Sequence, residues 1–173
     1  MLQINFCPES DKKEYIIAAR EYTNIWKRNQ KKIITLIEKY SNLTFKTTII
    51  NATTYEGISY SSPMRLRSSY SKNQKLAVLV HELLHRLLID NNFWFNKDLN
   101  IRTLEIHKLI YLILFDIWCD LLGNGAALKE KEREIGYGNR VYKEAWEWAL
   151  AFSKEQRTIE FKQMKEKYQR KAS

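Results

Sequence analysis

The spacing of apolar residues divides the chain into a long first helix, a short strand-rich part and a helical remainder. Between about residues 10 and 40, apolar positions recur at helical spacing, and Ser10 stands where an N-terminal cap is expected. Segment 43–50, LTFKTTII, is rich in β-branched residues and predicts a strand. Segment 57–70, GISYSSPMRLRSSY, predicts one or two short strands, with Pro63 at a sheet edge or in a turn.

Helices are predicted for most of the chain after residue 70. Ser71 and Gln74 form the capping-box pattern, and the helix that they open runs to about Asp90. A strongly apolar helix is predicted over 101–122, and 137–168 predicts one long amphipathic helix or a helix pair. This order of elements predicts an α+β fold, in which a small antiparallel or mixed sheet packs on helices and long helices lie at both ends.

Length and composition favour a single domain over residues 1–173. The chain has only five glycines and two prolines, so long linkers are not expected. The first residues do not have the pattern of a secretory signal, and the most apolar run is short and interrupted by Asp116 and Asp120. Two cysteines are too few for a disulfide framework. We therefore expect a cytoplasmic protein without a membrane segment.

The net charge of +9 favours acidic partners such as nucleic acid or anionic lipid. However, the basic residues alternate with glutamates in segments 129–140 and 154–171. Such mixtures are typical of solvated helix faces that carry ion pairs one turn apart. The charge by itself leaves both interpretations open.

The predicted helix over 72–90 contains the pattern H-E-x-x-H, formed by His81, Glu82 and His85. Residues four apart lie on one helix face, about 5–6 Å apart at Cβ, so two imidazoles can bind one metal ion. Glu82 is turned about 100° around the axis from His81, where it can activate a metal-bound water. The alternative is a core helix with two buried histidines, which would need several polar partners.

A catalytic zinc site takes three protein ligands, and Glu105 and His107 are the candidates for the third. Residues two apart on a helix point about 200° from each other, so only one of them can face the site. Helical phase groups Glu105 with Asp116 and Asp120 on an outer stripe and places His107 on the apolar side. We predict His107 as the ligand, with Glu105 or a simple core histidine as the alternatives. Tyr111 shares the face of His107 and can donate its hydroxyl to an oxyanion, unless it is a core residue.

The residues His81, Glu82 and His85 resemble the active-site helix of the zincin metallopeptidases. With a histidine downstream as the third ligand, the layout is similar to small single-domain proteins of the minigluzincin-like or SprT-like type. The resemblance implies a Zn²⁺ ion, with His81 and His85 as ligands and Glu82 as the general base. It also implies a sheet–helix–helix core over about 43–122, and an edge strand in 62–70 that pairs with an extended substrate.

The function predicted first is therefore a zinc-dependent metalloendopeptidase that acts on protein or peptide substrates. A second hypothesis is a basic nucleic-acid- or partner-binding protein with a structural or inactive zinc site, which five tryptophans and ten tyrosines would suit. A third is a regulatory peptidase with one protein partner. Metzincins have Gly and His where this chain has Leu88 and Asn91, so the motif does not assign a substrate.

Overall fold

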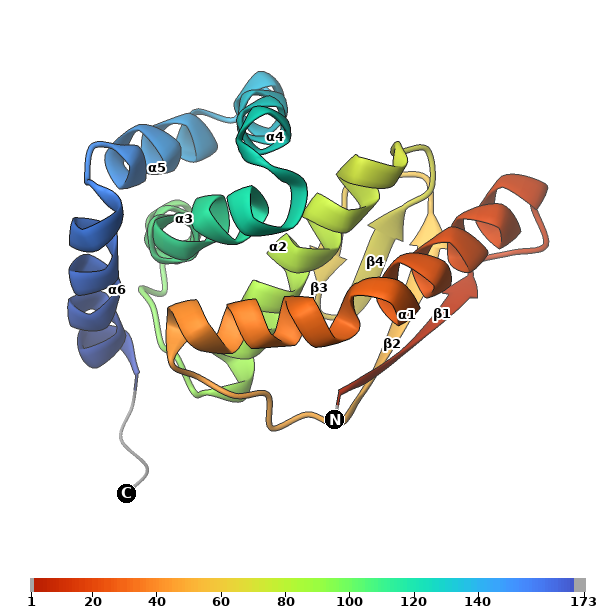
Figure 1. The fold of residues 1–173 in the computed structure, drawn as a ribbon, viewed down its shortest axis with the longest axis horizontal. Helices are drawn as coiled ribbons and strands as arrows, with labels where there is room; N and C mark the ends of the chain where they lie inside the picture. Colours follow the sequence, from red (N-terminus) through yellow and green to blue (C-terminus); the bar gives the residue numbers. More distant parts are fainter. Residues whose placement is uncertain (1, 170–173) are drawn as a thin grey trace.

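A computed structural model describes residues 2–169, and these form an α+β fold of six helices and one four-stranded sheet (Figure 1). The elements, in chain order, are β1 (Gln3–Pro8), α1 (Lys13–Ser41), β2 (Ile49–Tyr55), β3 (Tyr60–Ser61), β4 (Met64–Arg67), α2 (Lys72–Asp90), α3 (Leu99–Leu122), α4 (Asn124–Gly136), α5 (Arg140–Leu150) and α6 (Lys154–Tyr168). The predicted fold class is confirmed. Within the described part of the chain, no helix is long and apolar enough to cross a membrane.

The sheet is mixed, with the strand order β1-β2-β4-β3. Strands β1 and β2 pair in parallel, as do β2 and β4, whereas β3 runs antiparallel to β4. Helices α1 and α2 pack against the sheet, and α3 packs against both of them (Figure 1). The remaining helices gather around α3, and α4 also contacts α2.

Helix α2 lies at the centre of this arrangement. The capping box of Ser71 and Gln74 opens it, and the chain leaves it at Asn91, followed by Asn92 with a positive φ of 57°. Because α1, α3, α4 and two strands surround this helix, the whole run Ala77–Leu84 is buried rather than a single face of it. This explains why its sequence is apolar on nearly every side.

Two boundaries in the first part of the chain were predicted wrongly. Helix α1 begins at Lys13, and its N-cap is Lys12, which makes no side-chain cap, rather than Ser10. Segment 43–48 is not a strand, and β2 begins only at Ile49. The physical reason lies in α2, because the Asp90 carboxylate accepts hydrogen bonds from the backbone N–H groups of Lys46 and Thr47. The backbone of this segment is thus bound by a helix end rather than by a neighbouring strand.

One or two short strands were predicted for 57–70, and the structure has two, joined at Ser62–Pro63. The edge strand was placed wrongly in 62–70, because β4 lies inside the sheet and β3 forms the edge. The chain folds back after β3, so the shorter strand covers the longer one. Strand β1, which was not predicted, forms the opposite edge and lies outside the expected core of 43–122. The alternation of buried and exposed residues that would predict this strand is weak, because only Leu2 and Ile4 are buried there.

The C-terminal segment is a helix pair, α5 and α6, as one of the two predicted alternatives had it. Helix α6 covers the side of α3 that was expected to face solvent. Asp116 is buried there, and Arg157 of α6 donates to both of its carboxylate oxygens at 2.8 and 3.2 Å. The prediction of an outer position for Asp116 was therefore wrong. The carboxylate can be buried because Arg157, 41 residues further along the chain, neutralises its charge.

Candidate metal centre

The three residues of the H-E-x-x-H pattern lie on the buried middle of α2. His81 and Glu82 are 7% and 8% exposed, and His85 is half-buried. The Nε2 atoms of His81 and His85 are 3.0 Å apart, so the two rings face the same point. One helical turn separates the two residues, which is the spacing that the motif predicts.

Helix α3 brings His107 to the same point. Its ring centroid lies 5.5 Å from that of His81 and 5.0 Å from that of His85. One ring nitrogen from each of the three histidines lies within 4.8 Å of the others. Two ligand nitrogens at about 2.1 Å from a tetrahedral zinc ion are about 3.4 Å apart, so rings whose nitrogens lie up to 4.8 Å apart would close by at most about 1.4 Å around an ion. Three imidazoles that converge in this way fit a zinc ion.

The outer nitrogens of two of these rings are held by oxygen acceptors. The Nδ1 atom of His107 donates to the carbonyl oxygen of Thr103 at 2.7 Å. The Nδ1 atom of His81 lies 2.8 Å from a carboxylate oxygen of Glu134, to which it donates. A ring that donates from Nδ1 keeps its Nε2 lone pair for a metal, and such second contacts fix the tautomer and orientation of metal-ligating histidines.

Glu134 is the site residue that sequence reasoning missed. It lies on α4 and is 5% exposed, and its second carboxylate oxygen accepts from Nε1 of Trp146 on α5 at 3.1 Å. The segment around it was expected to form a solvated helix face, but Glu130 is buried as well, where it pairs with Arg133. The available signal was the spacing of four between the two glutamates, which places both on one face of α4.

The surroundings favour neutral imidazoles at two of the three positions. Burial, followed by the positive charge of His81, lowers the pKa of His107 to about 4 and that of His85 well below its ordinary value. Burial also opposes the charged form of His81, but the Glu134 carboxylate outweighs this and raises the pKa of His81. Neutral imidazole is the form that binds metal ions.

Glu82 has an unusual environment for a carboxylate. Burial raises its pKa to about 7, the positive charge of His81 opposes this shift, and Glu134 adds to it. A carboxylate with a pKa near neutrality can both accept and return a proton, which is the property of a general acid–base group.

Tyr111 lies on the same face of α3 as His107, as predicted. Its ring centroid is 5.4 Å from that of His107, and its ring stacks on Trp146 at 3.8 Å. The hydroxyl is buried and makes no hydrogen bond of good geometry with a described residue, although the Glu134 carboxylate lies near enough to act as its acceptor. Burial, followed by the charge of Glu134, raises the pKa of Tyr111 well above its ordinary value, so this group stays a donor.

Glu105, the alternative third ligand, does not belong to the group of side chains that converge. Its carboxylate accepts from the hydroxyl of Tyr168 at 2.8 Å and from the backbone N–H of Asn96 at 3.2 Å. These contacts hold it on the side of α3 that faces α6 and the preceding loop. The structure thus brings His107, and not Glu105, to His81 and His85.

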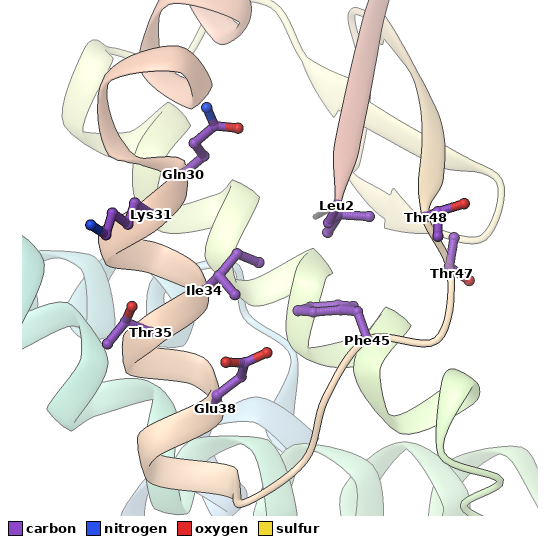
Figure 2. Close-up of a pocket in the computed structure, with 9 residues that line it drawn as sticks. All are labelled: Leu2, Gln30, Lys31, Ile34, Thr35, Glu38, Phe45, Thr47 and Thr48. Atoms are coloured by element: carbon purple, nitrogen blue, oxygen red, sulfur yellow. The ribbon is translucent and has the colours of Figure 1, made fainter.

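Two hollows differ in their relation to the histidines. A groove of about 810 Å³ includes His85 in its lining, together with Ser61 of the edge strand β3. A smaller pocket of about 250 Å³ lies between α1 and the segment before β2, where Ile34, Leu2 and Phe45 point toward one another (Figure 2). None of the three histidines lines this second pocket, so of these two hollows the first is the one connected with the candidate metal centre.

Comparison of the chain with models of protein families, with curated proteins and with solved structures found no match. The function must therefore be argued from the geometry of the site itself.

Proposed function

We propose that this protein is a zinc-dependent metallopeptidase of the zincin type. The observation that carries the proposal is the convergence of His81, His85 and His107 from two helices, with the buried Glu82 next to the first of them. Three protein ligands leave a fourth position for water, which is the arrangement of catalytic rather than structural zinc sites.

In this proposal each residue of the chain has one task. His81, His85 and His107 would hold a zinc ion, which would supply a Lewis acid for a bound water and for the carbonyl of the scissile bond. Glu82, the buried carboxyl group next to His81, takes a proton from the attacking water and returns it to the leaving amine. Tyr111 supplies a buried hydroxyl as a donor for the developing oxyanion, and Glu134 is the carboxylate that competes for this donor.

The residues behind the site act through the ligands. Glu134 and the Thr103 carbonyl fix the donor direction of His81 and His107. Trp146 in turn holds Glu134 and supports Tyr111 by stacking. Helices α4 and α5 are therefore part of the catalytic unit in this proposal, and not extensions added to it.

The experiment that tests the proposal compares the wild type with Glu82→Gln on a mixture of peptides made from a cell proteome, with cleaved bonds identified by mass spectrometry. Glutamine keeps the size of the side chain but cannot take a proton, so we expect cleavage to fall about 10²–10⁴-fold while zinc content stays at about one ion per chain. Glu38→Gln, in the pocket of Figure 2, is the matched control and should cleave like the wild type. Equal cleavage by Glu82→Gln and the wild type would rule out this mechanism.

We also propose a cytoplasmic location, because Cys7 and Cys119 are both free thiols.

A further inference from the structure

The groove beside His85 has features that the proposed chemistry does not use. It runs from Ser61 at the end of β3, past Leu88 and Ile89 on the last turns of α2, to the loop before α3. Its volume of about 810 Å³ lies in the range of ligand-binding sites. One of the candidate metal ligands, His85, lines it, so the groove lies next to the candidate metal centre.

The walls of the groove are apolar and partly open to solvent. Ile89 and Trp94 are 52% and 56% exposed, and Phe93 stacks on Phe95 beside them. Exposed apolar side chains that line one groove mark a binding surface, whereas single ones scattered over a surface do not. The chemistry of these walls suits a large apolar side chain.

The charged residues on the rim of the groove are basic. Lys97 and Arg102 line it, both are exposed, and neither forms an ion pair with a described residue. Among the described residues that line the groove there is no carboxylate. The two acidic residues nearest in sequence are both engaged with backbone N–H groups, because Asp98 caps α3 and Glu105 accepts from Asn96. The rim is therefore complementary to an acidic side chain.

The edge strand supplies the third element. Strand β3 pairs with β4 on one side and has no strand partner on the other among the described residues. Arg86, next to His85 on α2, donates to the hydroxyl of Ser62 and so ties the end of β3 to this helix. An open strand edge of this kind can pair with the backbone of an extended peptide.

We infer that the groove binds an extended peptide segment that places a large apolar side chain between α2 and the loop 93–97, and an acidic side chain within two positions of it against Lys97 and Arg102. The inference rests on the proposed peptidase function only in that it makes this peptide the substrate. Successive side chains of an extended strand alternate in direction, so two side chains that enter one groove from the same side of the peptide belong to residues two positions apart.

The test is designed to work without catalysis. The full chain with Glu82→Gln is immobilised in zinc-containing buffer, and the peptides that it retains from a synthetic mixture of random decapeptides are sequenced. We expect enrichment of Phe, Leu or Met with Asp or Glu within two positions. The double variant Lys97→Glu with Arg102→Glu should reverse the preference from acidic to basic residues, with a change of about fivefold to tenfold for two partly screened charge pairs.

The control carries the same change in net charge elsewhere, through Lys27→Glu with Arg28→Glu on the exposed side of α1. It should retain the acidic preference. No retained peptides, no acidic enrichment, or an enrichment that the reversal of Lys97 and Arg102 leaves unchanged would each overturn the inference.

Cleavage of the enriched peptides by the wild type is then measured separately. Peptides that bind as expected but are not cleaved would support the inferred peptide-binding groove and overturn the peptidase proposal. Cleavage that does not depend on the charge at positions 97 and 102 would support the peptidase proposal and overturn the inferred specificity of the groove.

Discussion

The contact between Glu134 and His81 leads to a prediction that separates the metal centre from the rest of the core. Glu134→Gln changes one atom in a buried side chain whose two oxygens each accept one hydrogen bond, from His81 Nδ1 and from Trp146 Nε1. Glutamine has one acceptor oxygen, so its amide NH₂ group must face one of these two N–H donors. One orientation loses the contact with His81, and the other loses the contact with Trp146 that holds the side chain against His81.

The expected size of the effect comes from the typical contribution of such second contacts to metal sites. Loss of such a partner typically weakens metal affinity about 10–100-fold, which corresponds to about 1.4–2.7 kcal/mol. Glu134 also supplies a negative charge that compensates a buried cation, so the upper half of this range is expected. At saturating zinc, the stabilisation of the folded chain by the metal should fall by the same amount.

The assay is a competition titration of zinc against a chromogenic chelator, with unfolding in urea as a second readout. The matched control is Glu130→Gln, one turn earlier on α4, where the carboxylate is buried and pairs with Arg133 but contacts no histidine among the described residues. The control should lose stability while its zinc affinity stays within about twofold of the wild type. A folded Glu134→Gln variant with wild-type zinc affinity would refute the reasoning.

Three further predictions test other parts of the structure. His107→Ala should lose zinc, whereas Glu105→Gln should keep about one ion per chain, as measured by elemental analysis. The reverse result would identify Glu105, rather than His107, as the third ligand. Asp116→Ala should lower the free energy of unfolding by about 3–5 kcal/mol in urea titrations, because it leaves Arg157 buried and unpaired. Wild-type stability of this variant would show that the ion pair does not stabilise the fold. Tyr111→Phe should lower kcat with little change in KM, because it removes a buried hydroxyl that the proposal assigns to the oxyanion. An unchanged kcat would assign the tyrosine to the core.

The sequence was informative wherever local rules decide the outcome. The capping box at Ser71, the end of α3 before Gly123 and the inward phase of His107 all follow from the geometry of a single helix. These rules place three of the site residues without any knowledge of the tertiary fold. They were sufficient for the proposed ligand set because each ligand lies in the middle of a long helix.

Sequence reasoning failed where a distant segment decides the environment of a residue. Asp116 was placed outside because its helix alone has an outer stripe, but α6 covers that stripe with Arg157. Glu134 was expected to face solvent because its segment is highly charged, but α4 folds back onto α2. Segment 43–48 has the composition of a strand, yet the Asp90 carboxylate binds its backbone. In each case one long-range polar contact outweighs a local preference.

These long-range contacts also bear on how the site is held together. Burial of two neutral imidazoles and a carboxylate in the apolar middle of α2 is unfavourable unless partners compensate it. The compensation comes from α3 through His107 and Thr103, from α4 through Glu134, and from α5 through Trp146 behind it. A metal ion at the three histidines would therefore join α2 and α3 directly and α4 through one hydrogen bond. Metal binding and the packing of the helical half of the molecule are then coupled, because the same side chains serve both.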